Sequence, residues 1–447
     1  MVEPRLAKPT VQFIDEYCQW YQSLFPEVRS FEAFKQLHLG LISEVKRKSL
    51  PAIAQVAGLD NAQSLHHFLT ESPWQIQDFR QHRLHLIKQS LSGREIVLVI
   101  DDTGDRKKGH QTDYVKRQYI GNLGKIENGI VAVTAYGVVD SIAIPLLFKV
   151  YKPKERLKPE DTYRSKPEIA AGIMRELKAI GFQFKLVLAD SLYGESGCGF
   201  IDVLYDLKLD FVVAIRSNHA VWLPRGQKVR CNRWRKFKRV FSDGKTELRY
   251  VREIIFGKRR TQQYWQLTTD PETLPKNATW CVMTQIENLK YDQVGNLYGL
   301  RNWVEYGLKQ SKNELGWADF RVTNYTQIER WWEMVMSAYL LVSLHTDSLH
   351  HLQSQPTIQR NAQPQAIALK LTQHPNWNSP NSWKQALNNL RLVLAPSVSL
   401  NLLQPWLNIF PIPRLSAGLE CLVALMNCFP GSLPCQAPPR GFRFSSA

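Results

Sequence analysis

Apolar residues in the first 92 positions recur at the spacing of amphipathic helices, as Phe13 and Tyr17 illustrate. Residues 49 to 60 predict a short helix that ends in a glycine turn, and residues 62 to 69 predict a second helix directly after it. This is the pattern of a helix-turn-helix, although any small helical bundle contains such turns. We therefore expect a helical N-terminal domain over residues 1–92, with DNA contact as its leading role.

From residue 95 the pattern changes from helical spacing to continuous apolar runs. Such runs are typical of strands that are buried on both faces. Turn residues between the second and third runs predict a hairpin. The expected strands are residues 96–100, 130–139, 142–151, 185–189 and 211–215, and the expected helices are residues 166–180 and 195–207. The order of strand, strand, strand, helix, strand, helix, strand indicates an α/β domain in which the first and fourth strands are neighbours.

The second half of the chain alternates β-rich, helical and irregular segments. Aromatic and β-branched runs with intervening turn residues, such as residues 242–244, predict a mainly β insertion over residues 217–285. The elements expected after it are a helix at about residues 297–315, a helix at residues 328–345, a linker rich in Gln, Pro and Asn at residues 353–382, and a helix at about residues 382–394. For the Pro-rich tail that follows, we expect no regular structure.

Charge and cysteine usage narrow the class of protein. The chain has 57 Lys and Arg against 40 Asp and Glu, a net charge of +17, which favours a polyanionic partner over a merely solubilising surface. Its seven cysteines form no Cys-x-x-Cys pair, so they indicate neither a zinc ribbon nor a redox motif, and they fit a reducing cytosol. The start of the chain has no apolar signal core, and the longest apolar run is too short to span a bilayer. We expect a cytoplasmic protein that handles nucleic acid, with no membrane partner.

Three acidic residues are candidates for a catalytic site. Asp102, beside Asp101, ends the first central strand, Asp190 ends the fourth, and Glu305 lies in the helix after the insertion. The carboxyl ends of neighbouring strands would bring the two aspartates together, and the helix would supply the third acid. Close carboxylates repel one another, and hard divalent cations such as Mg²⁺ relieve this repulsion. Two such ions stabilise the attacking and leaving oxygens of an in-line phosphoryl displacement.

Each acid also has a structural interpretation when it is taken alone. Asp102 could support a turn, Asp190 could cap a helix, and Glu305 could pair with Lys309 on a solvated helix face. The residues around Glu305 change this balance. Tyr298, Arg301, Glu305 and Lys312 are separated by 3, 4 and 7 positions. On a continuous helix they would share a sector of about 60°, a poor core stripe but a suitable face for DNA phosphate and metal.

With this spacing the chain resembles the DDE transposases of insertion sequences, in particular the IS-four type with its YREK signature. Tyr298, Arg301, Glu305 and Lys312 match the signature, and residues 99–104 and 188–194 resemble the two aspartate motifs of that family. The resemblance covers roughly residues 95–345. It implies an RNase H-like core that a β-rich insertion interrupts before the catalytic Glu.

The resemblance also implies domain limits and metal ligands. The core would comprise residues 93–216 and 286–350, the insertion residues 217–285, and the remainder residues 351–447. Asp102, Asp190 and Glu305 would form the Mg²⁺-binding triad, with Mn²⁺ as a substitute. Adjacent strand residues face opposite sides, so only one of Asp101 and Asp102 can be the ligand, and the acid-Asp-Thr pattern of the family favours the second.

A basic and aromatic stretch in the insertion is a second candidate DNA contact. Residues 230–239 contain six basic residues interleaved with Trp234 and Phe237, a pattern that suits phosphate contacts and base stacking, although a solvated basic hairpin would look similar. The residues chosen for DNA binding here are Arg233, Trp234, Arg235 and Lys236. Residues 106–108 and 258–260 are shorter basic clusters. Trp303, Trp331 and Trp332 are expected in the core.

The function that we expect is cutting of element ends and their joining to target DNA, with double-stranded DNA as the partner. Two ends must be brought together, so we expect a homodimer or a larger assembly. The alternatives are an RNase H-like nuclease without strand transfer and a domesticated, non-catalytic DNA-binding protein. The YREK spacing argues against the first, and the presence of all three acids argues against the second.

Overall fold

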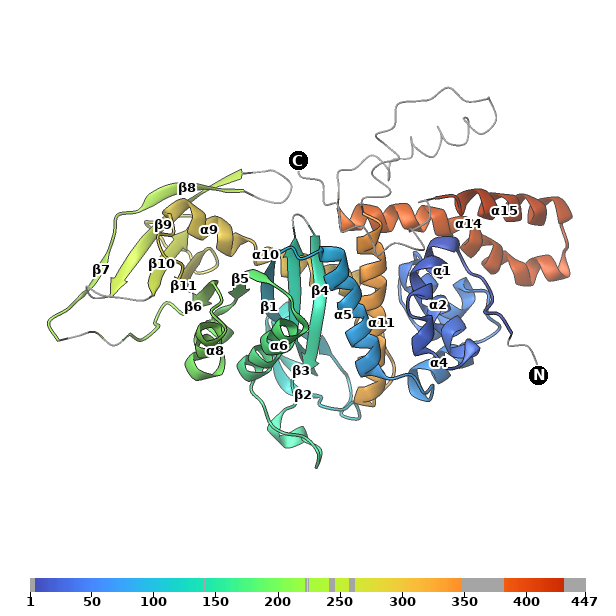
Figure 1. The fold of residues 1–447 in the computed structure, drawn as a ribbon, viewed down its shortest axis with the longest axis horizontal. Helices are drawn as coiled ribbons and strands as arrows, with labels where there is room; N and C mark the ends of the chain where they lie inside the picture. Colours follow the sequence, from blue (N-terminus) through green and yellow to red (C-terminus); the bar gives the residue numbers. More distant parts are fainter. Residues whose placement is uncertain are drawn as a thin grey trace, which may run out of the picture. The chain divides into compact units, whose positions relative to one another are not determined.

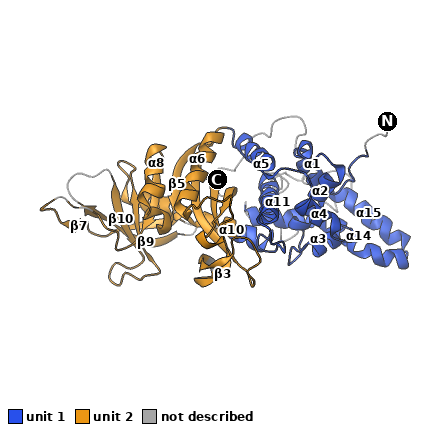
Figure 2. Cartoon of the chain, turned by 90° about the horizontal axis from the view of Figure 1, so that it is seen from below, with its two compact units in different colours: residues 1–92, 309–447 blue, residues 93–308 orange. Residues whose placement is uncertain are grey.

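The computed structural model describes most of the chain, namely residues 5–139, 142–221, 223, 225–240, 246–256, 262–346 and 382–429. It contains two compact units, coloured separately in Figure 2: residues 1–92 together with 309–447, and residues 93–308. The chain passes from the first unit to the second after residue 92, which is where the sequence placed a domain boundary. The helix expected at residues 328–345, which the sequence placed with the catalytic core, belongs to the same unit as the N-terminal helices.

The unit of residues 93–308 is built on one mixed sheet (Figure 1). Its first five central strands are β1 (Ile96–Arg106), β3 (Lys125–Val139), β4 (Ile142–Val150), β5 (Phe184–Ala189) and β6 (Phe211–Ile215). They run in the spatial order β4-β3-β1-β5-β6. The pairs β4–β3 and β3–β1 are antiparallel, whereas β1–β5 and β5–β6 are parallel. The expected pairing of the first and fourth strands is therefore confirmed.

Most of the expected elements of this region form, with two corrections. The strand expected to end at Ile100 continues as β1 to Arg106, and the helix expected at residues 195–207 is a π-helical turn followed by a short α-helix. Strands β5 and β6 are buried on both faces almost throughout, as their continuous apolar runs predicted. Helix α6 (Lys166–Ile180) begins at a capping box, in which Ser165 and Glu168 satisfy each other's backbone N–H groups. Shorter elements are β2 (Lys116–Ile120), which the sequence did not predict, η2 (Gly121–Leu123), η3 (Lys154–Arg156), α7 (Ser191–Gly194), the π-helical η4 (Gly197–Ile201) and α8 (Asp202–Asp206).

The predicted β insertion continues the central sheet. Its strands are β7 (Val229–Cys231), β8 (Arg235–Val240), β9 (Thr246–Phe256), β10 (Gln263–Thr268) and β11 (Thr279–Thr284). Strand β11 pairs antiparallel with β6, so the path β6-β11-β10-β9-β7 extends the sheet, and β8 pairs with β9. One hydrophobic cluster contains core-strand residues such as Val99 and insertion residues such as Trp265. The turn expected at residues 242–244 and the basic cluster at residues 258–260 lie outside the described residues.

The single helix expected at residues 297–315 is two helices in the structure, α9 (Tyr291–Gly299) and α10 (Asn302–Asn313). Between them the backbone N–H groups of Leu300 and Arg301 bond to carbonyls three residues back, at Leu297 and Tyr298. This tightened turn changes the helical phase. The calculation of one shared face from Tyr298 to Lys312 assumed a continuous helix. That assumption is wrong, because Tyr298 lies in the last turn of α9 and Arg301 lies between the two helices.

The helices of the other unit confirm the expected N-terminal region. They are α1 (Gln12–Gln19), η1 (Gln22–Leu24), α2 (Val28–Ile42), α3 (Leu50–Val56), α4 (Gln63–Thr70), α5 (Ile76–Leu91) and, after the sheet, α11 (Tyr325–Leu344). The turn between α3 and α4 contains Gly58 at φ +69°, a left-handed conformation that favours glycine. The two helices that the sequence predicted on either side of a glycine turn are thus both present.

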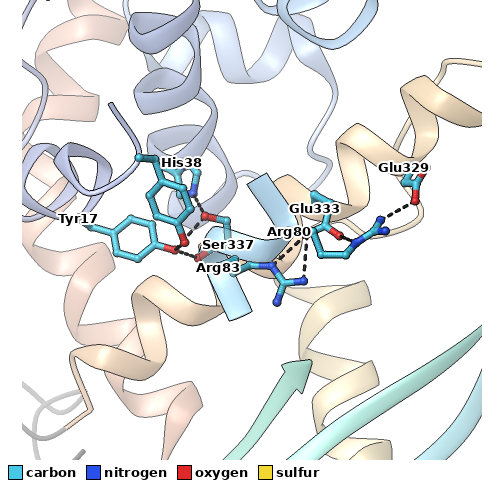
Figure 3. A network of polar contacts seen from close by, with 8 residues as sticks. Tyr17, His38, Arg80, Arg83, Glu329, Glu333 and Ser337 are labelled. Atoms are coloured by element: carbon cyan, nitrogen blue, oxygen red, sulfur yellow. Dashed lines mark hydrogen bonds and ion pairs between the residues drawn. The ribbon is translucent and has the colours of Figure 1, made fainter. Parts of the chain in front are cut away.

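Polar groups are buried between these helices (Figure 3). Fully buried Glu333 of α11 accepts hydrogen bonds from Arg80 (2.6 Å) and Arg83 (3.0 Å) of α5. Nearby, His38 lies with Nε2 2.8 Å from the Ser337 hydroxyl. Buried charges are tolerated only when they are paired in this way. Trp331 and Trp332 are buried, as expected. Trp303 belongs to the unit of residues 93–308 and is partly buried against the core of that unit.

The C-terminal region contains more helix than the sequence predicted. The helix expected at about residues 382–394 is α14 (Trp383–Ile409), which continues through Pro396 and Pro405, and a further helix, α15 (Pro413–Met426), packs against it. The expectation of an irregular tail from residue 395 is therefore wrong as far as residue 426. Proline disfavours a helix interior, but α14 packs against α2, α3 and α11 as well as against α15. Most of the expected linker and the last residues of the tail lie outside the described residues.

Candidate active site

The predicted aspartates lie together where β5 ends beside the middle of β1. Contrary to expectation, Asp102 does not end its strand, because β1 continues to Arg106. The parallel register of the two strands ends at Ile100 opposite Ala189. Asp101 and Asp102 follow on β1, and Asp190 follows directly after β5. The Asp190 side chain caps α7 by accepting a hydrogen bond from the backbone N–H of Leu192 at 2.9 Å. One of its oxygens thus has the structural role that the sequence allowed, and this bond fixes the position of the carboxylate.

Asp101 is buried and contacts Arg301, whose Nη2 lies 2.9 Å from its Oδ2. Burial raises the pKa of Asp101 to about 7, and the charges of Asp190 and Asp102 act in the same direction, while Arg301 opposes them. The raised pKa results from the low exposure of the Asp101 carboxyl group to water and from its proximity to two other carboxylates. Asp101 therefore belongs to the acidic cluster together with its neighbour.

Asp102 makes a different contact. Its Oδ2 forms an ion pair with Nζ of Lys166, the first residue of α6. Successive strand residues point to opposite faces, which agrees with the separate cationic partners of Asp101 and Asp102. Asp102 still affects Asp190: burial raises the pKa of Asp190, Arg301 lowers it, and the Asp102 charge raises it further.

Glu305 lies in the first turn of α10, and its side chain is 63 % exposed. Arg301 connects it to Asp101, because Nη1 of Arg301 lies 3.5 Å from Oε1 of Glu305 while Nη2 contacts Asp101. Tyr298 is within the same electrostatic environment: burial raises its pKa to about 12, and Asp190 is the largest acidic contribution. Lys312 lies in the last turn of α10, in the other compact unit.

The donor set suits a hard divalent cation in its chemistry. All three predicted ligands are carboxylates, and burial and mutual repulsion raise the pKa of Asp190 in the absence of added positive charge. Within the described ranges, no three side chains of His, Cys, Asp or Glu are close enough to hold a metal together. Instead, the ammonium of Lys166 and the guanidinium of Arg301 contact the carboxylates. The carboxylates fit a metal by their chemistry, and in this arrangement the two cationic side chains make the contacts that a metal would take over.

Several side chains at the site were not found from the sequence. Nothing in the sequence around Lys166 indicated a role at the site, because a lysine at the start of a helix is common. Tyr193 lies in the second aspartate motif, yet only the structure reveals that it is fully buried, that its hydroxyl has no hydrogen-bond partner, and that Asp102 and Asp101 affect its ionisation. Burial and these charges raise the pKa of Tyr193 far above its ordinary value, so its hydroxyl keeps its proton.

A small cavity of about 120 Å³ adjoins Glu305. Arg239 of β8 and Arg249 of β9 line it together with Arg301, Tyr298 and Trp280. Burial lowers the pKa of Arg239, and the positive charge of Arg249 acts in the same direction. Guanidinium groups gathered in this way favour an anion. The sequence identified the basic stretch that contains Arg239, but it could not place that residue beside the catalytic helix.

The basic stretch of the insertion is only partly available for binding. Arg233, Arg235 and Lys236 are exposed, as a DNA contact requires, whereas Trp234 is half-buried beneath the guanidinium of Arg252 at 4.4 Å. Phe237 is buried in the hydrophobic core, so the expectation that it stacks on bases is wrong. Trp265 of the insertion is also a core residue and is not available for base stacking.

Comparison with known proteins identifies the family. A family model described as "DDE superfamily endonuclease" matches residues 23–269, more than half of the chain. A protein of Microchaete diplosiphon, described as "Probable transposase for insertion sequence element IS701", is 60 % identical over 362 residues, which cover 79 % of this chain and 94 % of that protein. The chain belongs to the DDE transposases of insertion sequences.

Membership of this family confirms several expectations. The DDE transposase has an RNase H-like core, which the strand order β4-β3-β1-β5-β6 displays, and it is an enzyme that acts on DNA. Divalent metal ions are the cofactors of DDE transposases. The model match ends before Glu305, so it includes both aspartates but not the proposed third acid. Within the described part of the chain, no helix is long and apolar enough to cross a membrane.

Proposed function

We propose that this transposase cuts the ends of its insertion sequence and joins the freed 3′-hydroxyls to target DNA, with Asp102, Asp190 and Glu305 as ligands of Mg²⁺. The observation that carries this proposal is the convergence of the aspartates where the parallel pairing of β1 with β5 stops, with Arg301 bridging Asp101 and Glu305 beside them. Bound ions would polarise the scissile phosphate and activate the attacking oxygen. Mn²⁺ has the same preference for oxygen ligands and would substitute.

The protein side chains around the acids would position the DNA. Arg301 contacts two carboxylates in the structure, and on metal binding its guanidinium becomes available to a phosphate oxygen. Arg239 and Arg249 would hold a second phosphate next to Glu305. Tyr298 keeps its proton at neutral pH and would donate a hydrogen bond to the same strand. Lys312 and the exposed Arg233, Trp234, Arg235 and Lys236 complete the proposed DNA contacts.

Substitution of the acids tests the assignment. Asp102→Asn, Asp190→Asn and Glu305→Gln should each abolish nicking of end-labelled element DNA while binding to that DNA is retained. Glu272→Gln removes an exposed acid of the same unit and serves as the matched control. Asp101→Asn decides between the neighbours. If it abolishes nicking while Asp102→Asn does not, Asp101 is the ligand and our assignment of the first acid is wrong.

The proposed partners are the element ends and target DNA, bound by two copies of the transposase in the cytoplasm, in association with the bacterial nucleoid. Residues 1–92 would recognise the ends, since α3 and α4 have the length and turn of a helix-turn-helix. Deletion of this region should remove the preference for element ends over random DNA. Equal selectivity of the shortened chain would place recognition elsewhere.

A further inference from the structure

Large apolar side chains are exposed along the C-terminal hairpin, by which we mean residues 400–426 of α14 and α15. The two helices pack against each other, and they run side by side in Figure 1. Nine of the nineteen large apolar side chains that are exposed in the described ranges lie in this short segment. They are Leu402, Leu403, Trp406, Ile409, Phe410, Ile412, Leu415, Leu422 and Leu425. Monomeric proteins rarely leave such a cluster in water.

The exposed residues form stripes on the helices. On α14, Leu402, Leu403, Trp406 and Ile409 fall within a sector of about 120°, at 100° per residue. Leu407, which lies next to this sector, is buried. Helix α14 therefore has exposed apolar surface in addition to its buried residue Leu407. A stripe of this width is typical of a helix that packs on another element, and Trp406 and Phe410, with ring centroids 5.6 Å apart, resemble interface anchors.

The hairpin is also poor in charge, in a chain that is otherwise strongly basic. Between residues 392 and 429 the charged residues are Arg414 and Glu420, of opposite sign, whereas the whole chain has a net charge of +17. Two copies of such a chain repel each other over most of their surfaces. At the hairpin this repulsion is absent, and an apolar surface is complementary to its own copy, as a twofold interface requires.

The exposed area is sufficient for a stable contact. The exposed fractions of the nine side chains correspond to about four whole side chains, which at roughly 200 Å² each is on the order of 800 Å². A standard protein interface buries about 800 Å² per partner. Two hairpins that pack face to face would form a four-helix bundle, in which stripes of this kind become the core.

We propose that the C-terminal hairpin is the surface through which two copies of this transposase associate, so that two active sites act on paired ends. The pairing of ends rests on the proposed function, whereas the association itself rests on the apolar, uncharged surface. The charge of the chain disfavours self-association elsewhere, and this favours a second copy over other occupants.

The experiment is sedimentation of the full chain, with and without element-end DNA, compared with the variant Trp406→Glu/Ile409→Glu. Both side chains are exposed, Ile409 to 71 %, so that in a monomer the new carboxylates would remain in water. The matched control is Ile126→Glu/Leu248→Glu, which makes the same change of charge at two exposed apolar positions of the other unit. The wild type and the control should dimerise, and the hairpin variant should raise the dimer Kd at least about 100-fold.

A second measurement uses the wild type and does not depend on the folding of a variant. Cys421 on the hairpin and Cys428 directly after it are exposed free cysteines, and we call them the hairpin cysteines. Cys198 and Cys231 are exposed in the other unit. With a short bis-maleimide and a mixture of isotope-labelled and unlabelled chains, cross-links between copies should join the hairpin cysteines and not Cys198 or Cys231.

The outcomes separate this inference from the proposed function. Monomeric wild type under both conditions, unchanged dimers in the hairpin variant, or copies cross-linked through Cys198 would overturn the inference. Recruitment of monomers to vesicles of phosphatidylglycerol and phosphatidylethanolamine would overturn it too, because a membrane would then cover the hairpin. If dimers form as expected but the wild type does not cut DNA, the proposed function fails and the inference stands. A monomeric hairpin variant that nicks single ends but does not form paired-end products supports both.

Discussion

Glu333 is fully buried against two arginines, and its replacement by Gln should strongly destabilise the helical unit. The side chain is inaccessible to solvent, and both of its oxygens accept hydrogen bonds from arginines that are themselves buried. Gln preserves the shape but removes the charge and one acceptor. Arg83 then loses the carboxylate of Glu333, while Arg80 retains Glu329. Breaking a buried ion pair on one side costs about 3–5 kcal/mol.

The pH dependence of this effect has a defined direction. Burial opposes ionisation of Glu333, but Arg83 and Arg80 together outweigh it and lower the pKa of Glu333 below its ordinary value of 4.5. A lowered folded-state pKa stabilises the protein above the unfolded-state value, and this stabilisation is lost as the pH falls through the folded-state pKa. The difference between wild type and Glu333→Gln should therefore be constant near neutral pH and shrink below about pH 4.5.

Hydrogen exchange of peptides from α5 and α11 is the appropriate assay, because it measures the opening free energy of these helices separately from the sheet unit. Glu329→Gln is the matched control: its carboxylate pairs with Arg80 and is partly exposed, so its loss should cost about 1 kcal/mol or less. If Glu333→Gln and Glu329→Gln both lie within about 1 kcal/mol of the wild type, the buried network does not stabilise the unit as we have reasoned.

Four further predictions follow from the structure. Gly295→Val should destabilise the sheet unit by about 1–3 kcal/mol or more, because a Cβ at Gly295 would lie 2.1 Å from the Phe237 ring, and an unchanged melting temperature would contradict this close packing. Burial lowers the pKa of His38 to about 4, so the unfolding free energy should fall between pH 6.5 and 4, and less steeply in His38→Gln; parallel pH profiles would refute this. Tyr298→Ala should still nick the first DNA strand but form less of the DNA hairpin that arises when the freed 3′-hydroxyl attacks the opposite strand; double-strand breaks without this species on denaturing gels would refute the route. Cutting by the wild type should require Mg²⁺ or Mn²⁺, with Ca²⁺ supporting binding alone, and cutting in excess EDTA would end the metal proposal.

The elements of the catalytic unit were largely predictable because their sequence signals are local. The apolar runs of β5 and β6 and the glycine after α6 each indicate one kind of element, and the parallel pairing of β1 with β5 follows from the order of elements. The pairing of β11 with β6 was not predictable, since nothing in either strand specifies a partner from the other end of the insertion.

The candidate site was predictable in its residue types and not in its contacts. Motif spacing selected Asp102, Asp190 and Glu305, but the break between α9 and α10 was missed, although Gly299 stands at the end of α9. The partners of the two adjacent aspartates, Arg301 and Lys166, come from distant segments and have no pattern in common. The continuation of α14 through two prolines was missed because tertiary packing outweighed local propensity.

The shared ladder of β6 and β11 constrains how this enzyme can diverge. Because a one-residue slip between these strands would turn every side chain of the insertion to the other face, insertions and deletions are tolerable only in the connections between its strands. Exposed side chains on β8 and β9 can vary without a change in β1 and β5, which hold the aspartates, whereas Phe237 and Val251 share a core cluster with those strands. New preferences for DNA could thus arise in the insertion while the chemistry of the carboxylates stays the same.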